Sequence, residues 1–318
     1  MTHAQPSRAG GPGLRGCGTA LATPFNTDGS IDDGALRALV DWQIEEGIHF
    51  LVPCGSTGEA ATMSLEEHCS VVRVTIDQAK GRVPIVAGAG SNDTQKAIAL
   101  SKEMRDLGAT HLLHTSPMYN KPPQRGIVAH YRAIAEAVDL PIVVYNVPGR
   151  TGSNIEAKTT LEMAKIRGIA AVKEASGSLA QITDILRGRG ASGSSGHSPA
   201  ARNSAPFSVL SGDDEMALAV MALGGDGVVS VISNVVPRLM SQLCERMLGG
   251  DLAGARDIHF QLLPWMRAAF IESNPIPVKA ALAMMGKARN VLRLPLVPLA
   301  DTHAETVRGA LRGVGAVG

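Results

Sequence analysis

Short apolar runs alternate with longer segments of helical periodicity along almost the whole chain. Eight such runs occur, mostly about 30 residues apart, which is the length of a βα unit. Most are continuous apolar stretches, such as PIVVYNVP and IAAVKEAS. Continuous apolar strands are typical of parallel sheets that are covered on both faces. The runs begin near Thr19, Phe50, Pro84, His111, Pro141, Ile169, Ser208 and Gly227.

The segments between these runs carry the period of amphipathic helices. Ser64 and Glu67 have the spacing of a capping box before the second of them. Glycines at positions 47, 81 and 108 stand where helices are expected to end. The apolar positions of the first two segments are Leu36, Leu39, Val40 and Ile44, and then Leu65, Cys69, Val72 and Ile76.

Eight βα units in one chain predict a (β/α)8 TIM barrel with a C-terminal helical extension. The alternative is an open, doubly wound sheet of six or seven strands. No GxGxxG sequence follows the first strand and no P-loop occurs, so nucleotide binding of either kind is not supported. We expect a disordered tail at 1–15, the barrel at 16–236, and the last barrel helix with the extension at 237–318. Within the barrel, the Gly/Ser/Pro/Ala-rich residues 188–206 predict a flexible surface insert.

Composition narrows the class of protein. The 318 residues include 30 Lys+Arg and 29 Asp+Glu, a net charge of +1, which predicts no nucleic-acid or anionic-membrane partner. No apolar run approaches the ~18 residues of a membrane span, and the N-terminal residues lack the apolar core of a signal peptide. Four scattered cysteines and nine histidines without HxH or HExxH spacing argue against a disulfide framework and a metal site. We therefore expect a soluble, cytoplasmic, metal-free protein.

Lys173 is the first candidate for chemistry, because catalytic groups of such barrels project from the C-terminal ends of strands. It ends the apolar run that starts at Ile169, whereas the other eight lysines fall in helical or loop segments where a solvated stem is expected. Burial disfavours an ammonium, so we expect a lowered pKa and a neutral, nucleophilic amine. Imine formation with a carbonyl substrate requires such an amine. The alternative is a structural lysine paired with Glu174 or Glu59.

Polar groups also follow the neighbouring strands. Tyr145 ends the adjacent run, and parallel strands lie ~5 Å apart, so its hydroxyl can carry protons for a carbinolamine. Residues 55–59 (GSTGE) offer hydroxyls and backbone N–H groups that can converge on a carboxylate. Arg150 is a candidate for binding a substrate carboxylate, and Gly212 lets a ligand approach the backbone. The alternatives are a core tyrosine and an exposed loop arginine.

Six motifs in order, GSTGE, SPMYNKP, YNVPGRTG, VKEASG, LSGDD and GGDGVVSV, carry a resemblance to a known group of enzymes. The chain resembles the pyruvate-dependent class I aldolase superfamily, which includes N-acetylneuraminate lyase and 4-hydroxy-tetrahydrodipicolinate synthase (dihydrodipicolinate synthase). The likeness covers nearly everything from about Gly16 onward, except the insert. The RTG after YNVP and the segment NPIPVK at 274–279 look like the synthase. That branch condenses pyruvate with aspartate 4-semialdehyde to 4-hydroxy-tetrahydrodipicolinate, on the route to diaminopimelate and lysine.

The resemblance implies catalytic roles for four residues. Lys173 would form the imine with pyruvate, and this covalent imine would replace any separate cofactor. Tyr145 would shuttle protons together with Ser56 and with Tyr119, the last reaching in from a neighbouring subunit.

Four further residues would bind substrate by the same resemblance. Thr57 would bind the pyruvate carboxylate, and Arg150 the carboxylate of the semialdehyde. Gly212 and Val229 would line the site through their backbone. The resemblance also implies a homotetramer built from two tight dimers.

Two other functions stay open. Ser56 stands where the synthase usually has threonine and where sialate lyases commonly have serine. A sister aldolase or dehydratase acting on a keto-deoxy sugar acid, or on an N-acetylneuraminate-like substrate, would share Lys173 and Tyr145. Arg150 favours a short substrate with a terminal carboxylate over a polyol. A catalytically silent scaffold would require a broken lysine–tyrosine pair, and both residues are present.

Regulation is the last expectation. Many members of the synthase branch are inhibited by lysine bound between two subunits. By the resemblance, Leu65, Lys96 and Met118 replace a histidine, a glutamate and a tyrosine of lysine-sensitive relatives. Because Lys96 puts a like charge where the ammonium of the effector would bind, we expect lysine to leave the rate essentially unchanged.

Overall fold

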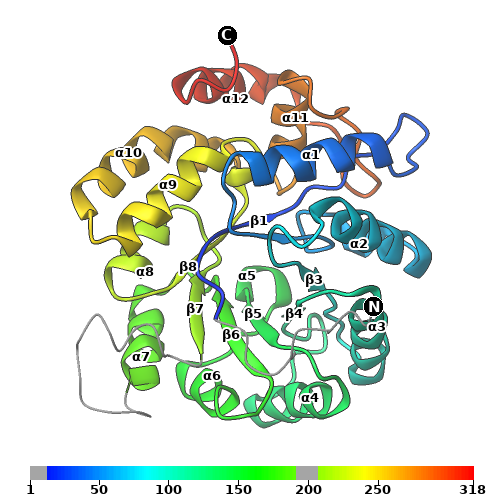
Figure 1. Ribbon diagram of the computed structural model, residues 1–318, viewed down its shortest axis with the longest axis vertical. Helices are drawn as coiled ribbons and strands as arrows, with labels where there is room; N and C mark the ends of the chain where they lie inside the picture. The colour runs from blue at the N-terminus through cyan, green and yellow to red at the C-terminus, as the bar shows by residue number, and fades with distance from the viewer. Residues whose placement is uncertain (1–12, 191–206) are drawn as a thin grey trace, which may run out of the picture.

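Eight parallel strands form the centre of the computed structural model, which describes residues 13–190 and 207–318 (Figure 1). They follow the order β2-β1-β8-β7-β6-β5-β4-β3, and a bridge between Leu51 and Ile85 joins the two ends into a closed barrel. The strands are β1 (Gly16–Ala20), β2 (Phe50–Val52), β3 (Val86–Gly88), β4 (His111–Thr115), β5 (Ile142–Asn146), β6 (Ile169–Glu174), β7 (Ser208–Ser211) and β8 (Gly227–Ser230). Each corresponds to one of the eight apolar runs, so the predicted TIM barrel is confirmed.

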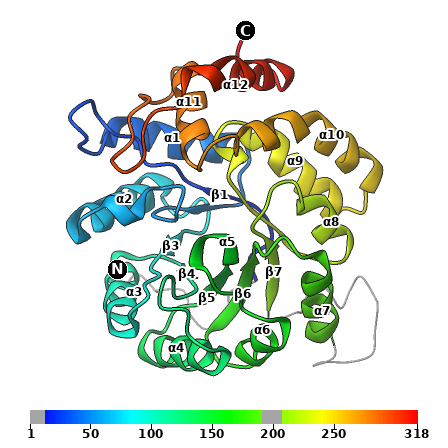
Figure 2. The same cartoon turned by 180° about the vertical axis from the view of Figure 1, so that it is seen from behind.

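Helices surround the strands as the alternating pattern predicts (Figures 1 and 2). Two short 3-10 turns, 60–62 and 232–234, follow β2 and β8. The helices of the ring are α1 (Asp33–Glu45), α2 (Leu65–Ala79), α3 (Thr94–Leu107), α4 (Gln124–Ala137), α5 (Pro148–Thr151), α6 (Ala157–Met163), α7 (Leu179–Gly190), α8 (Ala217–Ala222) and α9 (Pro237–Leu248). The expected capping box at the start of α2 is present, with Ser64 and Glu67 bonded to each other's backbone N–H.

The C-terminal extension comprises α10 (Leu252–Ala268), α11 (Ile276–Met284) and α12 (Asp301–Gly313). In both views α12 lies at the outer edge of the molecule, and α11 lies between it and the barrel (Figures 1 and 2). Residues 276–282 of α11 are all buried, including a lysine. This burial makes α11 part of the core, and it brings the segment just before α11 to the barrel.

Two separate apolar clusters hold the barrel together, as its geometry requires. The larger fills the space between strands and helices. The smaller fills the interior of the barrel and takes residues from all eight strands. On β1, Gly18 faces the interior, where a Cβ would come within 1.9 Å of the Phe50 ring. The ring of Phe50 therefore occupies the space that a side chain at position 18 would need.

Three segments of the fold differ from the sequence expectations. Helix α7 continues to Gly190, so residues 188–190 are helical; the rest of the expected insert, 191–206, lies outside the described residues. Leu14 is buried within the inner cluster, although it was expected in the tail; residues 1–12 lie outside the described part of the chain. Leu65 is 59% exposed rather than on the apolar face of α2, because it is the first residue of the helix.

The close approach of Gly18 and Phe50 gives a test of the inner core. We expect Gly18→Ala to destabilise the protein by about 1–3 kcal/mol, because an added methyl group in a filled core forces its neighbours to move. Gly309→Ala is the matched control, since Gly309 is exposed on α12 and a Cβ there meets no atom within 4 Å. Urea unfolding of both variants measures the difference, and equal midpoints would contradict this account of the barrel interior.

Candidate active site

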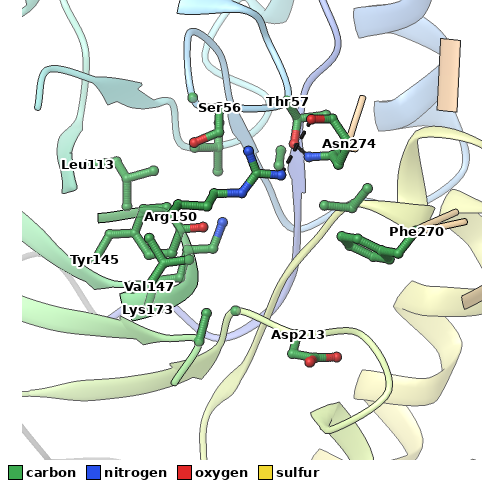
Figure 3. A pocket seen from close by; sticks show the side chains of 16 residues that line it. Ser56, Thr57, Leu113, Tyr145, Val147, Arg150, Lys173, Asp213, Phe270 and Asn274 are labelled. Atoms are coloured by element: carbon green, nitrogen blue, oxygen red, sulfur yellow. Dashed lines mark hydrogen bonds between the residues drawn. The ribbon is translucent and has the colours of Figure 1, made fainter. Parts of the chain in front are cut away.

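A cavity of about 160 Å³ opens at the C-terminal ends of the strands (Figure 3). Its walls come from the ends of β1, β2, β4, β5 and β6, from the loops that follow β2, β7 and β8, and from the connection between α10 and α11. Six of the eight residues expected at the site line it, namely Ser56, Thr57, Tyr145, Arg150, Lys173 and Gly212.

Lys173 points into the centre of the cavity from β6 (Figure 3). Its side chain makes no salt bridge within the described residues. The two carboxylates that could have paired with it bind other groups: Glu174 accepts from the Ser176 N–H and the Asn146 amide, and Glu59 pairs with Lys279. The structural reading of Lys173 as a partner of Glu59 or Glu174 is therefore wrong.

Burial lowers the pKa of the Lys173 ammonium from 10.5 to about 8. The negative charge of Asp214 opposes this shift, and the nearby Arg150 guanidinium adds to it. A pKa of about 8 leaves a substantial fraction of neutral amine near neutral pH. The direction of this shift is the one expected for a lysine near the end of a buried strand.

Asp214 is a buried acid that the sequence analysis did not single out. One carboxylate oxygen accepts the backbone N–H groups of Val231 and Ile232 at 2.9 and 3.1 Å, and the other has no partner in the described structure. Burial raises the pKa of its carboxyl group to about 6. The signal was its position in the LSGDD motif after β7, where only Gly212 was considered. Its charge limits how far the pKa of Lys173 falls.

Tyr145 is the neighbour of Lys173 across the β5–β6 ladder. The Lys173 Nζ lies 4.2 Å from the centroid of the Tyr145 ring, so the two side chains share one small space. Burial raises the pKa of the Tyr145 hydroxyl to about 12, against a smaller opposing effect of Arg150. The phenol therefore keeps its proton at neutral pH, in a position to exchange it with a group bonded to the amine.

Thr57 and Ser56 reach the cavity from the loop after β2. Thr57 is buried, and its Oγ1 accepts a hydrogen bond from the Asn274 amide at 2.9 Å (Figure 3). Because a hydroxyl that accepts here keeps its own hydrogen free, Thr57 can donate into the cavity. Ser56 is exposed at the mouth of the cavity.

Arg150 projects from the short helix α5 over the mouth of the cavity (Figure 3). It is exposed, and its Nη2 donates to the Asn274 carbonyl at 3.4 Å. Phe270 lies on the facing side of the mouth. Asn274 thus contacts both Thr57 and Arg150. In the sequence, the NPIPVK segment around Asn274 is only a family signal, because nothing along the chain indicates that it packs on the loop after β2.

The three remaining predicted residues are Gly212, Val229 and Tyr119. A Cβ at Gly212 would lie 2.7 Å from the Ala175 Cβ and 3.1 Å from the Lys173 Cγ, so only glycine leaves the lysine stem undisturbed. Val229 is buried in the inner cluster and does not line the cavity. Tyr119 lies outside the cavity and is 88% exposed.

The described residues offer neither a cluster of metal ligands nor a membrane-spanning helix. Residues 13–190 and 207–318 contain no group of three or more His, Cys, Asp and Glu side chains that could hold a metal ion. No helix in this part of the chain is long and apolar enough to cross a membrane.

Comparison with known proteins gives a consistent result. Residues 13–313 match the model of the Dihydrodipicolinate synthetase family. A 4-hydroxy-tetrahydrodipicolinate synthase of Koribacter versatilis is 53% identical, over 90% of this chain and 91% of that protein.

Solved structures of such synthases also superpose on the chain. The enzyme from Acinetobacter baumannii, solved in complex with pyruvate, matches with a TM-score of 0.89 and 40% identity, covering 96% of this chain and all of that one. A monomeric dihydrodipicolinate synthase variant gives the same TM-score and identity, with 96% and 98% coverage. With a lysine–tyrosine pair at the strand ends of a matching barrel, the chain belongs to the dihydrodipicolinate synthetase family.

Proposed function

We propose that the cavity at the strand ends condenses pyruvate with aspartate 4-semialdehyde through an imine on Lys173. Membership of the family establishes a lyase of the aldolase type that makes 4-hydroxy-tetrahydrodipicolinate in lysine biosynthesis. The single observation that carries the mechanism is a buried lysine amine, without a carboxylate partner among the described residues, in contact with a buried tyrosine.

The chemistry begins at the Lys173 amine. The neutral Nζ adds to the keto carbon of pyruvate, and the resulting carbinolamine loses water to give an iminium ion. Loss of a methyl proton converts this ion to an enamine, whose carbon forms the new bond to the aldehyde carbon of the second substrate. The amine of that substrate then attacks the imine carbon and releases Lys173, so the enzyme is restored. The imine is the only cofactor-like species in this scheme.

Tyr145 carries the protons of these steps. It donates to the carbinolamine oxygen as water leaves, which suits a phenol that stays protonated at neutral pH. We propose that Ser56 and the Tyr119 hydroxyl of a neighbouring subunit complete the proton path. The exposure of Tyr119 in the single chain supports this role, because a residue that serves another subunit must project from its own.

Each of the two substrates carries a carboxylate that the site must bind. We propose that the Thr57 hydroxyl and the backbone N–H groups around it bind the carboxylate of pyruvate. Arg150 at the mouth binds the carboxylate of the semialdehyde through its guanidinium fork. Gly212 leaves room for the Lys173 stem, whereas Val229 lies in the inner cluster and does not line the cavity.

The assembly proposed for this chain is a homotetramer of two tight dimers. A monomeric variant exists among the solved relatives, so family membership alone does not fix the number of subunits. The proposal depends on Tyr119, because its hydroxyl can complete a proton path only if a second subunit lies beside it. We also propose that lysine does not inhibit, because Lys96 on α3 would place a like charge beside the ammonium of the effector.

Trapping with borohydride tests the identity of the reactive lysine. Incubation with pyruvate and borohydride should inactivate the enzyme and leave a reduced adduct on the peptide that carries Lys173, detected by mass spectrometry. Lys279 is the internal control, because burial also lowers its pKa to about 8 although it lies outside the cavity. An adduct on Lys279, or none on Lys173, would refute the mechanism.

The pKa of Lys173 predicts how imine formation depends on pH. Only the neutral amine reacts, so at low pyruvate concentration the rate should rise about tenfold per pH unit below pH 8 and level off above it. Rapid mixing with a borohydride quench at each pH measures this rate. A rate that keeps rising toward pH 10.5 would show that the amine is not perturbed.

Arg150 tests the class of the second substrate. If its guanidinium binds a carboxylate, Arg150→Ala should reduce kcat/KM for the semialdehyde by a factor that corresponds to about 1.5–3 kcal/mol, as for hydrogen bonds to charged groups. Trapping of the pyruvate imine should survive. Arg187→Ala, which removes an exposed arginine of α7, is the control. Equal loss of both steps would indicate a structural role and favour the sugar-acid alternative.

A further inference from the structure

We propose that the buried Glu59–Lys279 ion pair is a positioning element: it ties the loop after β2 to α11 and thereby sets the affinity of the site for a substrate carboxylate. The inference rests on the proposed role of Thr57, which lies two residues before Glu59. Neither Glu59 nor Lys279 lines the cavity. Both would act through the loop that carries Thr57 and Ser56.

The pair is fully withdrawn from solvent. The Glu59 and Lys279 side chains are 0% and 1% exposed, and the Lys279 Nζ donates to the Glu59 carboxylate. The other Glu59 oxygen accepts the backbone N–H of Arg293 at 3.1 Å. The same Nζ also donates to the Val291 carbonyl at 2.8 Å. Each charged group thus has partners from the chain that follows α11.

Besides its two hydrogen-bond acceptors, the Lys279 ammonium contacts an aromatic ring. Its Nζ lies 3.9 Å from the centroid of Phe25, and the Arg293 guanidinium lies 4.5 Å from the same ring. An ammonium has three hydrogens, and here each has a partner in a carboxylate, a carbonyl or a π face. These contacts fix the Lys279 ammonium, which together with the Arg293 N–H holds the Glu59 carboxylate.

The backbone of the loop needs this anchor. Cys54 and Glu59, on either side of residues 55–58, have φ angles of 55° and 56°, in the left-handed region that side chains other than glycine rarely adopt. Such a conformation persists only where the surroundings impose it. The Glu59 carboxylate supplies part of that constraint, and the Thr23 hydroxyl, which donates to the Gly58 carbonyl at 2.8 Å, supplies another.

A second contact joins the same two segments inside the cavity. Asn274, two residues before α11, donates to the Thr57 Oγ1 at 2.9 Å (Figure 3). Lys279 lies five residues later on α11. Because the loop and the start of α11 are joined at both points, a shift of Lys279 moves Asn274 relative to Thr57. The Thr57 hydroxyl hydrogen would then lose the direction in which it meets a carboxylate.

A buried ion pair is not by itself the most stable way to join two segments, because apolar residues of similar volume often serve as well. The chain contains a second ion pair of low exposure, Arg189–Asp226, with side chains that are 14% and 10% exposed. It joins the end of α7 to the residue before β8, at the opposite end of the strands from the cavity. This pair provides the matched control for the one beside the site.

The test is a mutant cycle on kcat/KM for pyruvate. Glu59→Gln with Lys279→Met removes both charges at similar volume, and Thr57→Val removes the hydroxyl. We expect the charge-free pair to lower kcat/KM at least tenfold, mainly through a higher KM. In the Thr57→Val background, removal of the two charges should lower kcat/KM less than twofold, because the hydroxyl that the pair positions is already absent. Arg189→Met with Asp226→Asn should leave kcat/KM within twofold, even though we expect thermal unfolding to show a loss of stability.

The outcomes are distinct. Losses that multiply independently, or a charge-free pair that keeps the wild-type KM, overturn the positioning role. If Glu59→Gln/Lys279→Met does not fold, Glu59→Asp takes its place in the cycle, because it keeps both buried charges and only shortens the carboxylate arm by one methylene group. Borohydride trapping of pyruvate on wild-type enzyme separates the two proposals. No adduct on Lys173 overturns the proposed function and the positioning role together, whereas an adduct with independent losses overturns only the latter.

Discussion

The site depends on the energetically unfavourable burial of one ammonium group, that of Lys173. Lys173 lies next to the last residue of β6 inside a filled barrel. The carboxylates of Glu59 and Glu174, which could have neutralised it, bind other groups. Its ammonium therefore gains too little from the protein to offset the loss of water, and the pKa falls to about 8. The negative charge of Asp214 opposes this fall, so the amine still takes up a proton below about pH 8. A carboxylate closer to the amine would raise the pKa of Lys173 further and keep it protonated and unreactive.

The surroundings of Lys173 follow from this constraint. Gly212 has no side chain because a Cβ would press on the lysine stem. Tyr145 gives the amine a π face and an uncharged hydroxyl instead of an anion. The charged groups that the reaction needs for substrate carboxylates stand further out, at the mouth, where Arg150 remains exposed to solvent. The charged group for the substrate carboxylate thus lies at the mouth of the cavity, and the reactive amine of Lys173 lies deeper inside it.

The barrel and its reactive pair could be predicted from the sequence, because both depend on local pattern. Apolar runs and helical periods mark the strands and helices, and Lys173 and Tyr145 stand directly at strand ends. Asn274 and Lys279 could not be placed in this way, since their contacts with Thr57 and Glu59 join segments more than 200 residues apart. Lys279 was expected to have a solvated stem and is instead fully buried, because α11 belongs to the core. Tertiary packing determines where such residues lie, and it leaves no periodic pattern in the sequence.

The most direct test of the central claim is the pKa of the Lys173 amine itself. Trace acetylation with acetic anhydride at a series of pH values, followed by mass spectrometry of the peptide that carries Lys173, reports the fraction of neutral amine. The account predicts a midpoint near pH 8 in the folded enzyme and near the ordinary lysine value of 10.5 after unfolding. A folded-state midpoint near 10.5 would show that burial does not activate this lysine, and would contradict the account.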